Sequence, residues 1–161
     1  MRRLARSSDG FTFIELVVAT AVMMVLASAA MPLARVSIKR QKEADLHREL
    51  REMRAAIDAY HDAVTSNIIG GLNVSTTSEG YPPDLETLVN GVVRANDPSG
   101  KKIKFLRRIP VDPMTASTDW GMRAYADKPD ATAWGGSNVF DIYSKSPDKG
   151  LDGTKYKDWL P

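Results

Sequence analysis

The sequence predicts an α+β protein in which one long N-terminal helix packs on a small antiparallel β-sheet. Three observations lead to this fold class. Residues 10–31 form an almost wholly apolar run. Between residues 46 and 64, apolar side chains then recur at alternating spacings of four and three, which is the period of a half-buried helix. The final third contains two stretches that are rich in aromatic and β-branched residues, as β-strands are.

The apolar run of residues 10–31 is about 20 residues long, which is enough for a helix to cross the hydrocarbon core of a bilayer. It contains a single ionisable residue, Glu15. A carboxylate inside hydrocarbon costs roughly 2.5–3.5 kcal/mol or more, so a functional role is the default expectation for it. We therefore predict a transmembrane helix over residues 11–31, preceded by a separate leader over residues 1–10.

The leader is basic, with arginines at positions 2, 3 and 6. Positive charge in front of a membrane span places the N-terminus in the cytoplasm. A secretory signal peptide is cut after its apolar region, which is then lost. In this chain the span is too long for that, and the small residue Gly10 comes before it. The pattern predicts a cut at the cytoplasmic face that leaves the apolar helix on the mature protein.

Beyond the membrane span, the helical pattern continues as a stem over residues 32–65. Pro32 predicts a kink or a break of the helix, because proline lacks one backbone donor and clashes with the preceding turn. Residues 35–45 are polar on nearly every face, which is typical of a helix that spans solvent or lies among neighbouring subunits. A stripe follows that predicts burial against a sheet, formed by Leu46, Leu50, Met53, Ile57, Tyr60 and Val64. One helix from about Phe13 to about Thr65 is expected.

Residues 66–161 are expected to form the globular region. Residues 66–80 have a loop composition, and the prolines at 82 and 83 precede a short amphipathic helix that contains Leu85, Leu88 and Val89. Residues 96–102 are expected to be loop, and residues 105–113 a proline-punctuated connector that turns Leu106 and Ile109 inward. Strands are predicted over residues 120–126 and 138–144, with a possible third strand over residues 156–159, which together give a three-stranded antiparallel sheet.

Composition and motifs argue against several functional classes. The chain has 161 residues and a net charge of +2, which gives no reason to expect a nucleic-acid partner. No phosphate-binding glycine loop follows a strand, and no grouping of nucleophile, histidine and acid is suggested, so we do not expect an enzyme. His47 and His61 lie beside the apolar stripe and are predicted to face solvent without a ligand role. There are no cysteines, so a small exported domain would depend on a metal ion or on its packing.

Residues 10–16, GFTFIEL, resemble the N-terminal signal of type IV pilins and their relatives, in which a glycine is followed by the pattern F-T-x-x-E-L. Pro32 matches that family's helix break. The resemblance implies a pilin-like fold, cleavage by a prepilin peptidase after Gly10, and N-methylation of Phe11. It also implies that Glu15 meets the N-terminal ammonium of Phe11 in an adjacent subunit. The alternatives are a protonated Glu15, a Glu15 that reaches back to the interface, or a plain membrane anchor that carries a stray glutamate.

The remainder of the chain resembles the major pseudopilins of type II secretion systems, the general secretion pathway protein G-like branch of the pilin relatives. The segments that carry the resemblance are residues 80–82, 85–88, 106–113, Trp120, Gly121, Tyr125, residues 141–144 and residues 158–159. The chain departs from that pattern at Met114, where an aromatic residue usually stands, and in the insertion of residues 115–119.

This second resemblance implies a structural subunit that polymerises through its N-terminal helix into a periplasmic pseudopilus and so drives protein export. The implied partners are copies of the same chain, other pseudopilins, the prepilin peptidase, and an inner-membrane assembly platform with its ATPase. The chain would cross the inner membrane once, with its C-terminal domain in the periplasm. Two alternatives remain, which are a type IV pilin or minor pilin of a surface fibre, for adhesion, motility or DNA uptake, and an anchored periplasmic binding domain that never polymerises.

The C-terminal loop, SKSPDKGLDGTKYKDW over residues 144–159, combines aspartates with glycines. Calcium takes six to eight oxygen ligands, commonly carboxylates and main-chain carbonyls of a bent loop. Major pseudopilins bind one calcium ion in this loop. The resemblance implies that Asp148 is an acidic ligand, that Lys145 offers its main-chain carbonyl, and that Asp152 or, alternatively, Asp158 completes the acidic set. The competing interpretation is that these aspartates are turn and cap residues only.

Overall fold

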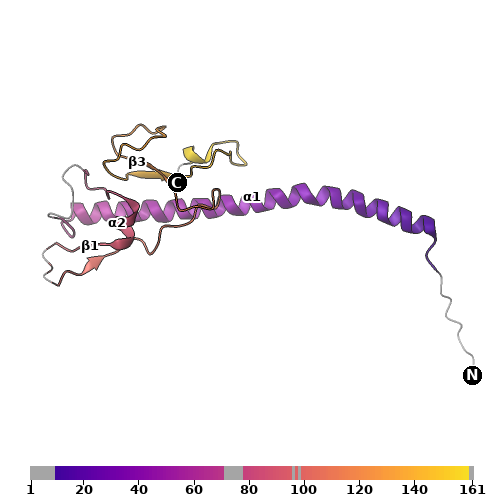
Figure 1. Cartoon of the computed structure of the whole chain (residues 1–161), viewed down its shortest axis with the longest axis horizontal. Helices are drawn as coiled ribbons and strands as arrows, with labels where there is room; N and C mark the ends of the chain where they lie inside the picture. The colour runs from indigo at the N-terminus through magenta and orange to yellow at the C-terminus, as the bar shows by residue number, and fades with distance from the viewer. Residues whose placement is uncertain (1–9, 71–77, 96, 98, 160–161) are drawn as a thin grey trace, which may run out of the picture. The chain divides into compact units, whose positions relative to one another are not determined.

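The computed structural model describes residues 10–70, 78–95, 97 and 99–159. The predicted leader, apart from Gly10, therefore lies outside the described residues. The chain divides into two compact units, residues 1–39 and residues 40–161. Helix α1 (Phe13–Thr65) contributes residues to both units, and it is the longest element of the chain (Figure 1). The prediction of one long N-terminal helix is thus confirmed, with the expected ends.

A hydroxyl cap explains why α1 begins where it does. The Thr12 hydroxyl oxygen accepts a hydrogen bond from the Glu15 backbone N–H (3.3 Å). The Thr12 carbonyl accepts the first helical bond, from the Leu16 N–H (3.2 Å). A threonine immediately before a helix stabilises it by satisfying donors that have no partner inside the helix.

At Pro32 the structure differs from the expectation. Helix α1 carries Pro32 in its interior, and the residues on both sides remain helical. The predicted break of the helix is therefore wrong, whereas the alternative, a kink at Pro32, stays a prediction. A proline removes only its own N–H from the helical ladder. In a helix of 53 residues, the loss of one such bond leaves the turns before and after it intact.

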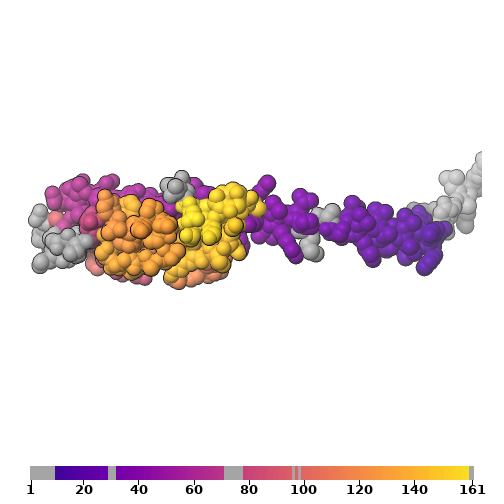
Figure 2. Space-filling view, turned by 90° about the horizontal axis from the view of Figure 1, so that it is seen from above, coloured from indigo at the N-terminus to yellow at the C-terminus, as the bar shows by residue number. Residues whose placement is uncertain are grey.

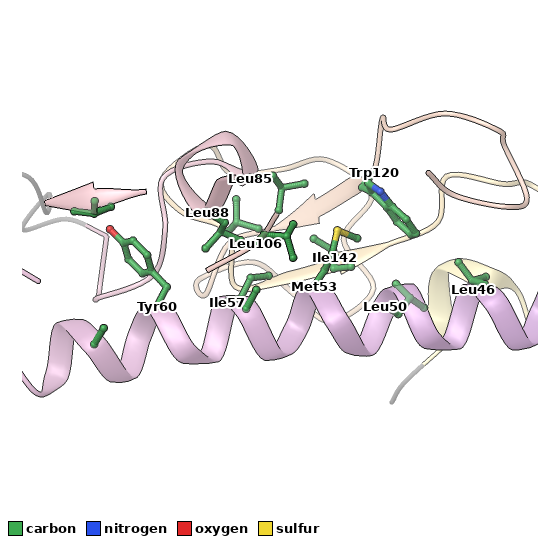
Figure 3. Packing of buried hydrophobic residues seen from close by; sticks show 14 of the residues in the cluster. Leu46, Leu50, Met53, Ile57, Tyr60, Leu85, Leu88, Leu106, Trp120 and Ile142 are labelled. Carbon is green, nitrogen blue, oxygen red and sulfur yellow. The ribbon is translucent and has the colours of Figure 1, made fainter. Parts of the chain in front are cut away.

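The apolar stripe forms the core of the unit of residues 40–161. Leu46, Leu50, Met53, Ile57 and Tyr60 are each at most 1% exposed. Figure 3 shows these five side chains along one side of α1, where they face a second group made up of Leu85, Leu88, Leu106, Trp120 and Ile142. Full burial of a large apolar side chain contributes roughly 1.5–3 kcal/mol, so this contact stabilises the attachment of the later chain to the helix.

The short amphipathic helix is confirmed as α2 (Leu85–Asn90). Asp84 caps it, since its Oδ1 atom accepts hydrogen bonds from the Thr87 N–H and the Thr87 hydroxyl, both at 2.7 Å. The helix ends at Gly91, whose φ of 76° lies in the left-handed region that favours glycine. The connector that follows also behaves as expected, because Leu106 is buried and Ile109 packs against the core.

The β-structure consists of two separate antiparallel pairs. Strand β1 (Val92–Val93) pairs with β2 (Lys102–Ile103), and β3 (Gly121–Arg123) pairs with β4 (Asp141–Tyr143). The register of the second pair places Met122 opposite Ile142. The predicted pairing of the two aromatic-rich stretches is confirmed, although each strand is shorter than expected.

The predicted third strand is wrong. Residues Tyr156–Asp158 form a 3₁₀-helix, η2, because the Asp158 N–H donates to the Lys155 carbonyl (2.9 Å) and the Trp159 N–H to the Tyr156 carbonyl (3.3 Å). These local bonds use the donors that a sheet ladder would need. Helix η2 instead contacts β4, and Figure 2 shows the orange β3–β4 region beside the yellow C-terminal segment.

The expectation that the two histidines face solvent is also wrong. The His47 ring stacks on the Trp159 ring, with centroids 4.3 Å apart and planes 12° from parallel. The His61 ring stacks on the Tyr81 ring at the same centroid distance and at 13°. Both histidines lie at the margins of the apolar stripe, where segments from later in the chain cover α1. Each ring is therefore partly buried.

Candidate processing, assembly and metal sites

The predicted processing junction lies immediately before α1. Gly10 and Phe11 are both exposed, and the Phe11 side chain is 81% exposed. A Cβ atom added at Gly10 would meet nothing within 4 Å, and the φ of Gly10 is not positive. Neither space nor backbone conformation within the described residues therefore requires a glycine at this position.

Glu15 is the third residue of α1 and is exposed. A carboxylate in the first turn of a helix is favoured by the positive end of the helix dipole. Within the part of the chain that the structure describes, no cation pairs with Glu15. Its carboxylate is therefore available to a partner outside these residues.

Sequence reasoning missed the local role of this residue pair. Thr12 and Glu15 have the spacing of a capping box, S/T-x-x-E, in which the first hydroxyl bonds to the backbone N–H of the acidic residue. The structure forms that bond. The spacing of Thr12 and Glu15 alone predicts the cap. The same residues also belong to the pilin-like signal, and the sequence was interpreted only in those terms.

The membrane-spanning prediction fits the surface of α1. One helix, α1, is long and apolar enough to cross a membrane, with a mean hydropathy of 2.2 over its best 18-residue window and none of that window buried. The exposed large apolar side chains at its N-terminal end include Phe13, Ile14, Leu16, Val18, Met23, Met24 and Leu26. Apolar surface of this extent requires cover from lipid or from other helices.

In the C-terminal loop, Asp152 forms a turn. Its Oδ1 atom accepts from the Thr154 N–H (2.9 Å) and from the Thr154 hydroxyl (2.7 Å). These bonds, the hydroxyl bond first, hold the pKa of Asp152 below its ordinary value. The turn is closed by the Gly150 N–H, which donates to the Thr154 carbonyl (2.7 Å), and the Trp159 indole N–H donates to the Thr154 hydroxyl oxygen (2.6 Å).

The contacts of the other predicted calcium-binding residues are as follows. The Asp148 N–H donates to the Ser146 hydroxyl oxygen (3.3 Å), and Asp158 lies in η2, 3.5 Å from the Lys157 ammonium. The Lys145 ammonium pairs with Asp119 (2.6 Å). Within residues 10–70, 78–95, 97 and 99–159, no three histidine or acidic side chains come close enough to hold a metal ion. The proposed set has two acidic ligands and a main-chain carbonyl, and its calcium binding stays a prediction.

Sequence reasoning also missed the residue that holds this loop on α1. One carboxylate oxygen of Glu43 accepts from the Leu151 N–H (2.9 Å) and from the Tyr156 hydroxyl (3.0 Å). Burial, together with the hydrogen bond to the Glu43 carboxylate, raises the pKa of Tyr156. Glu43 belongs to the polar segment of residues 35–45, which was expected to span solvent or to lie among neighbouring subunits. Its partners lie 108 and 113 residues later in the chain, so no local pattern signals the contact.

A partly buried ion triad joins α1 to the second strand pair. Asp141 of β4 accepts from the Arg54 Nε of α1 (2.7 Å) and from a terminal nitrogen of Arg123 of β3 (3.2 Å). Arg54 also donates to the Trp159 carbonyl (3.2 Å), and Arg123 donates to the Lys157 carbonyl (2.9 Å). The triad thereby holds the C-terminal segment in place as well as the two strands.

Comparison with known families matches residues 5–31 to the prokaryotic N-terminal methylation motif. The matched range contains Gly10, Phe11 and Glu15. A comparison with curated proteins and a comparison with solved structures each gave no match. The motif implies processing by a prepilin peptidase and self-assembly into filaments. Together with the exposed apolar helix, the match supports a type IV pilin-like N-terminal region and suits a membrane-anchored, single-pass protein.

Proposed function

We propose that this chain is a pseudopilin, a structural subunit of the periplasmic pseudopilus of a type II protein secretion system. The observation that carries the proposal is an exposed apolar helix whose first residues are preceded by the sequence GFTFIEL and a basic leader. A prepilin peptidase would remove the leader after Gly10, and Phe11 would become the methylated N-terminus. Before assembly, the subunits would be anchored in the inner membrane, with their C-terminal domains in the periplasm.

Assembly would then replace lipid around the helix by the helices of neighbouring subunits. The apolar side chains stay covered in both environments, so their transfer changes little free energy. Glu15 is the exception, because an unpaired carboxylate in hydrocarbon is costly. The N-terminal ammonium of Phe11 in an adjacent subunit would compensate that charge and set the axial register between the two subunits. An assembly ATPase, acting through a membrane platform, would supply the work of extraction.

The assignment to a pseudopilin rather than to a pilin depends on the C-terminal resemblance described above. A type IV pilin or minor pilin is the second candidate, since it would use the same N-terminal motif. Mechanical shearing of cells separates the two, because shearing releases a surface fibre and leaves a periplasmic one with the cells. Recovery of the chain in the sheared fraction would contradict the pseudopilus proposal and favour the surface fibre.

The test of the proposed assembly role compares two substitutions one helical turn apart. Glu15→Gln removes the charge and keeps the helix cap, whereas Thr12→Val removes the cap and keeps the charge. We expect Glu15→Gln to abolish filament formation and Thr12→Val to allow it, as measured by electron microscopy of filaments and by crosslinking between engineered cysteine pairs near residue 15. Assembly by Glu15→Gln, or equal defects in the two variants, would contradict a charge-pairing role for Glu15.

Calcium in the C-terminal loop is part of the same proposal, with Asp148, the Lys145 carbonyl, and Asp152 or Asp158 as its ligands. What supports it is the resemblance, together with the absence of cysteine from the sequence. We expect calcium to raise the melting temperature of the full chain in maltoside micelles relative to chelator, since a ligand of the folded state at about 100 times its Kd adds about 2.7 kcal/mol. Asp148→Asn should remove the shift, and Asp130→Asn, outside the loop, should keep it. Equal melting temperatures with calcium and with chelator would rule the site out.

A further inference from the structure

A pocket of about 410 Å³ lies between β4 and the segment that leads into η2. Its lining residues include Lys145, Lys155 and Lys157, and none of the described residues that line it is acidic. We propose that this lysine pocket binds a phosphate group. The proposal does not depend on the proposed filament function.

The charges of the lysine pocket are only weakly compensated. Lys145 and Lys157 each pair with an aspartate. The two side chains are 46% and 72% exposed in the Lys145–Asp119 pair, and 27% and 49% exposed in the Lys157–Asp158 pair. Exposed ion pairs contribute little and exchange readily. Within the described residues, Lys155 forms no ion pair. An anion that binds in the pocket can therefore replace the aspartates as the partner of these ammonium groups at a small cost in free energy.

Ser146, which also lines the pocket, offers a hydroxyl donor. Ser146 is 7% exposed, and its oxygen accepts from the Asp148 N–H (3.3 Å), while no described residue accepts its proton. Below it, the Ser144 hydroxyl donates to Asp112 (2.6 Å) and its oxygen accepts from the Ser146 N–H (3.2 Å). This chain of hydrogen bonds fixes the backbone at Ser146 and leaves its hydroxyl proton for a ligand.

The walls of the pocket are held by buried groups. The Tyr143 hydroxyl donates to the Thr132 carbonyl (3.1 Å), and the Arg123 guanidinium lies over the Tyr143 ring, 4.3 Å from its centroid. Arg123 also fixes the backbone at Lys157, as described above. The lysines therefore extend from a preformed frame.

The donor set selects the chemistry of the ligand. Three lysines and Ser146 line one cavity, and their ammonium and hydroxyl groups are donors that suit an anion with several oxygens. A planar carboxylate is better matched by the two-pronged guanidinium of an arginine, whereas lysine binds phosphate as a point charge. The phosphate group has two sources of the same chemistry, free phosphate or the diester of a phospholipid headgroup.

The test is a titration of the full chain in maltoside micelles, followed by the backbone amide NMR signals of residues 144–147 and 155–157. The probes are inorganic phosphate and glycerophosphoglycerol, which is the headgroup of phosphatidylglycerol without acyl chains, each compared with chloride at equal ionic strength. Saturable shifts with phosphate alone indicate free phosphate as the ligand, and saturable shifts with the diester indicate the headgroup. Without saturable shifts from either probe, the proposal is wrong.

Variants separate the pocket from general attraction to a basic surface. The double substitution Lys155→Gln with Lys157→Gln should weaken binding roughly tenfold, as expected for the loss of two charge-assisted contacts at a partly exposed site. Lys128→Gln removes one exposed lysine outside the pocket and should leave the affinity unchanged. An unchanged melting temperature establishes that the double variant is folded. Equal affinities in the double variant and in Lys128→Gln would overturn the assignment.

Discussion

Single residues in this chain carry roles that depend on one or two hydrogen bonds each. Thr12 begins α1, Asp84 begins α2, and Asp152 forms the turn of the C-terminal loop. The sequence indicates such residues well when both partners are local, as in the prolines and aspartate before α2. It indicates them poorly when the partner is distant, as for Glu43, because nothing near Glu43 in the sequence marks the tyrosine that it binds.

Asp127 provides a residue-scale prediction for pH dependence. Its Oδ2 atom accepts from the Ala124 N–H (2.7 Å) and from the Gly135 N–H (3.0 Å), and these bonds hold its pKa below the ordinary value of 3.8. A lowered pKa in the folded state means that the contribution to stability is complete above that ordinary value. It is then lost as the pH falls through the folded pKa.

We therefore expect Asp127→Asn to lower stability at neutral pH and to flatten the loss of stability below about pH 4. The measurement is the urea midpoint of unfolding between neutral and acidic pH. Asp130→Asn, three residues away, is the matched control and should keep the slope of the native chain. An equally steep acid limb in Asp127→Asn would contradict the role of the two backbone bonds.

At the scale of elements, α1 was predictable because its pattern is long. The apolar run and the stripe each repeat over several turns, so the signal accumulates. The sheet was less predictable, since strands of two or three residues are too short for an alternating pattern to stand out. Helix η2 was not predicted for a related reason, because its aromatic residues suggested a strand. Its conformation is set instead by local backbone hydrogen bonds and by the packing of Trp159 on His47.

Two leucines of α1 give a prediction at this scale. Leu50 is 1% exposed and lies in the core, whereas Leu33 is 73% exposed. Leu50→Ala should lower the free energy of unfolding of the globular part by roughly 2–5 kcal/mol, because the cavity it leaves adds to the lost burial. Leu33→Ala should leave that free energy unchanged. Denaturant unfolding followed by near-ultraviolet circular dichroism checks this, and equal losses would contradict the division of α1 into a buried stripe and an uncovered segment.

At the scale of the whole molecule, the triad of Arg54, Asp141 and Arg123 joins segments that the sequence keeps far apart. Arg54 and Asp141 are separated by 87 positions. The strand containing Asp141 was predicted, but its pairing with two arginines was not, because charge alone does not identify which residues meet. The candidate processing site is the opposite case, since all of its residues lie within one short motif that is legible without any fold.

The triad gives a prediction of its own. Asp141→Asn leaves two partly buried guanidinium groups without their carboxylate, which should cost roughly 3–5 kcal/mol of stability. Asp119→Asn breaks the exposed pair with Lys145 and should cost at most about 1 kcal/mol. Thermal melting of both variants measures the difference. If Asp141→Asn loses no more thermal stability than Asp119→Asn does, the triad does not hold the C-terminal segment in place.

In the proposed filament, the uniform apolar surface of the first turns of α1 limits how neighbouring subunits can align. A helix that is equally apolar on every face gives a neighbouring subunit no preferred rotation or axial position. Only a polar or charged side chain on that surface can fix the alignment. Two hydroxyls interrupt the surface, but Thr20 donates to the Val17 carbonyl and Ser28 to the Val25 carbonyl of the same helix, at 2.9 and 2.7 Å. Among the described side chains of this stretch, Glu15 is therefore the one that would align neighbouring subunits in the proposed filament.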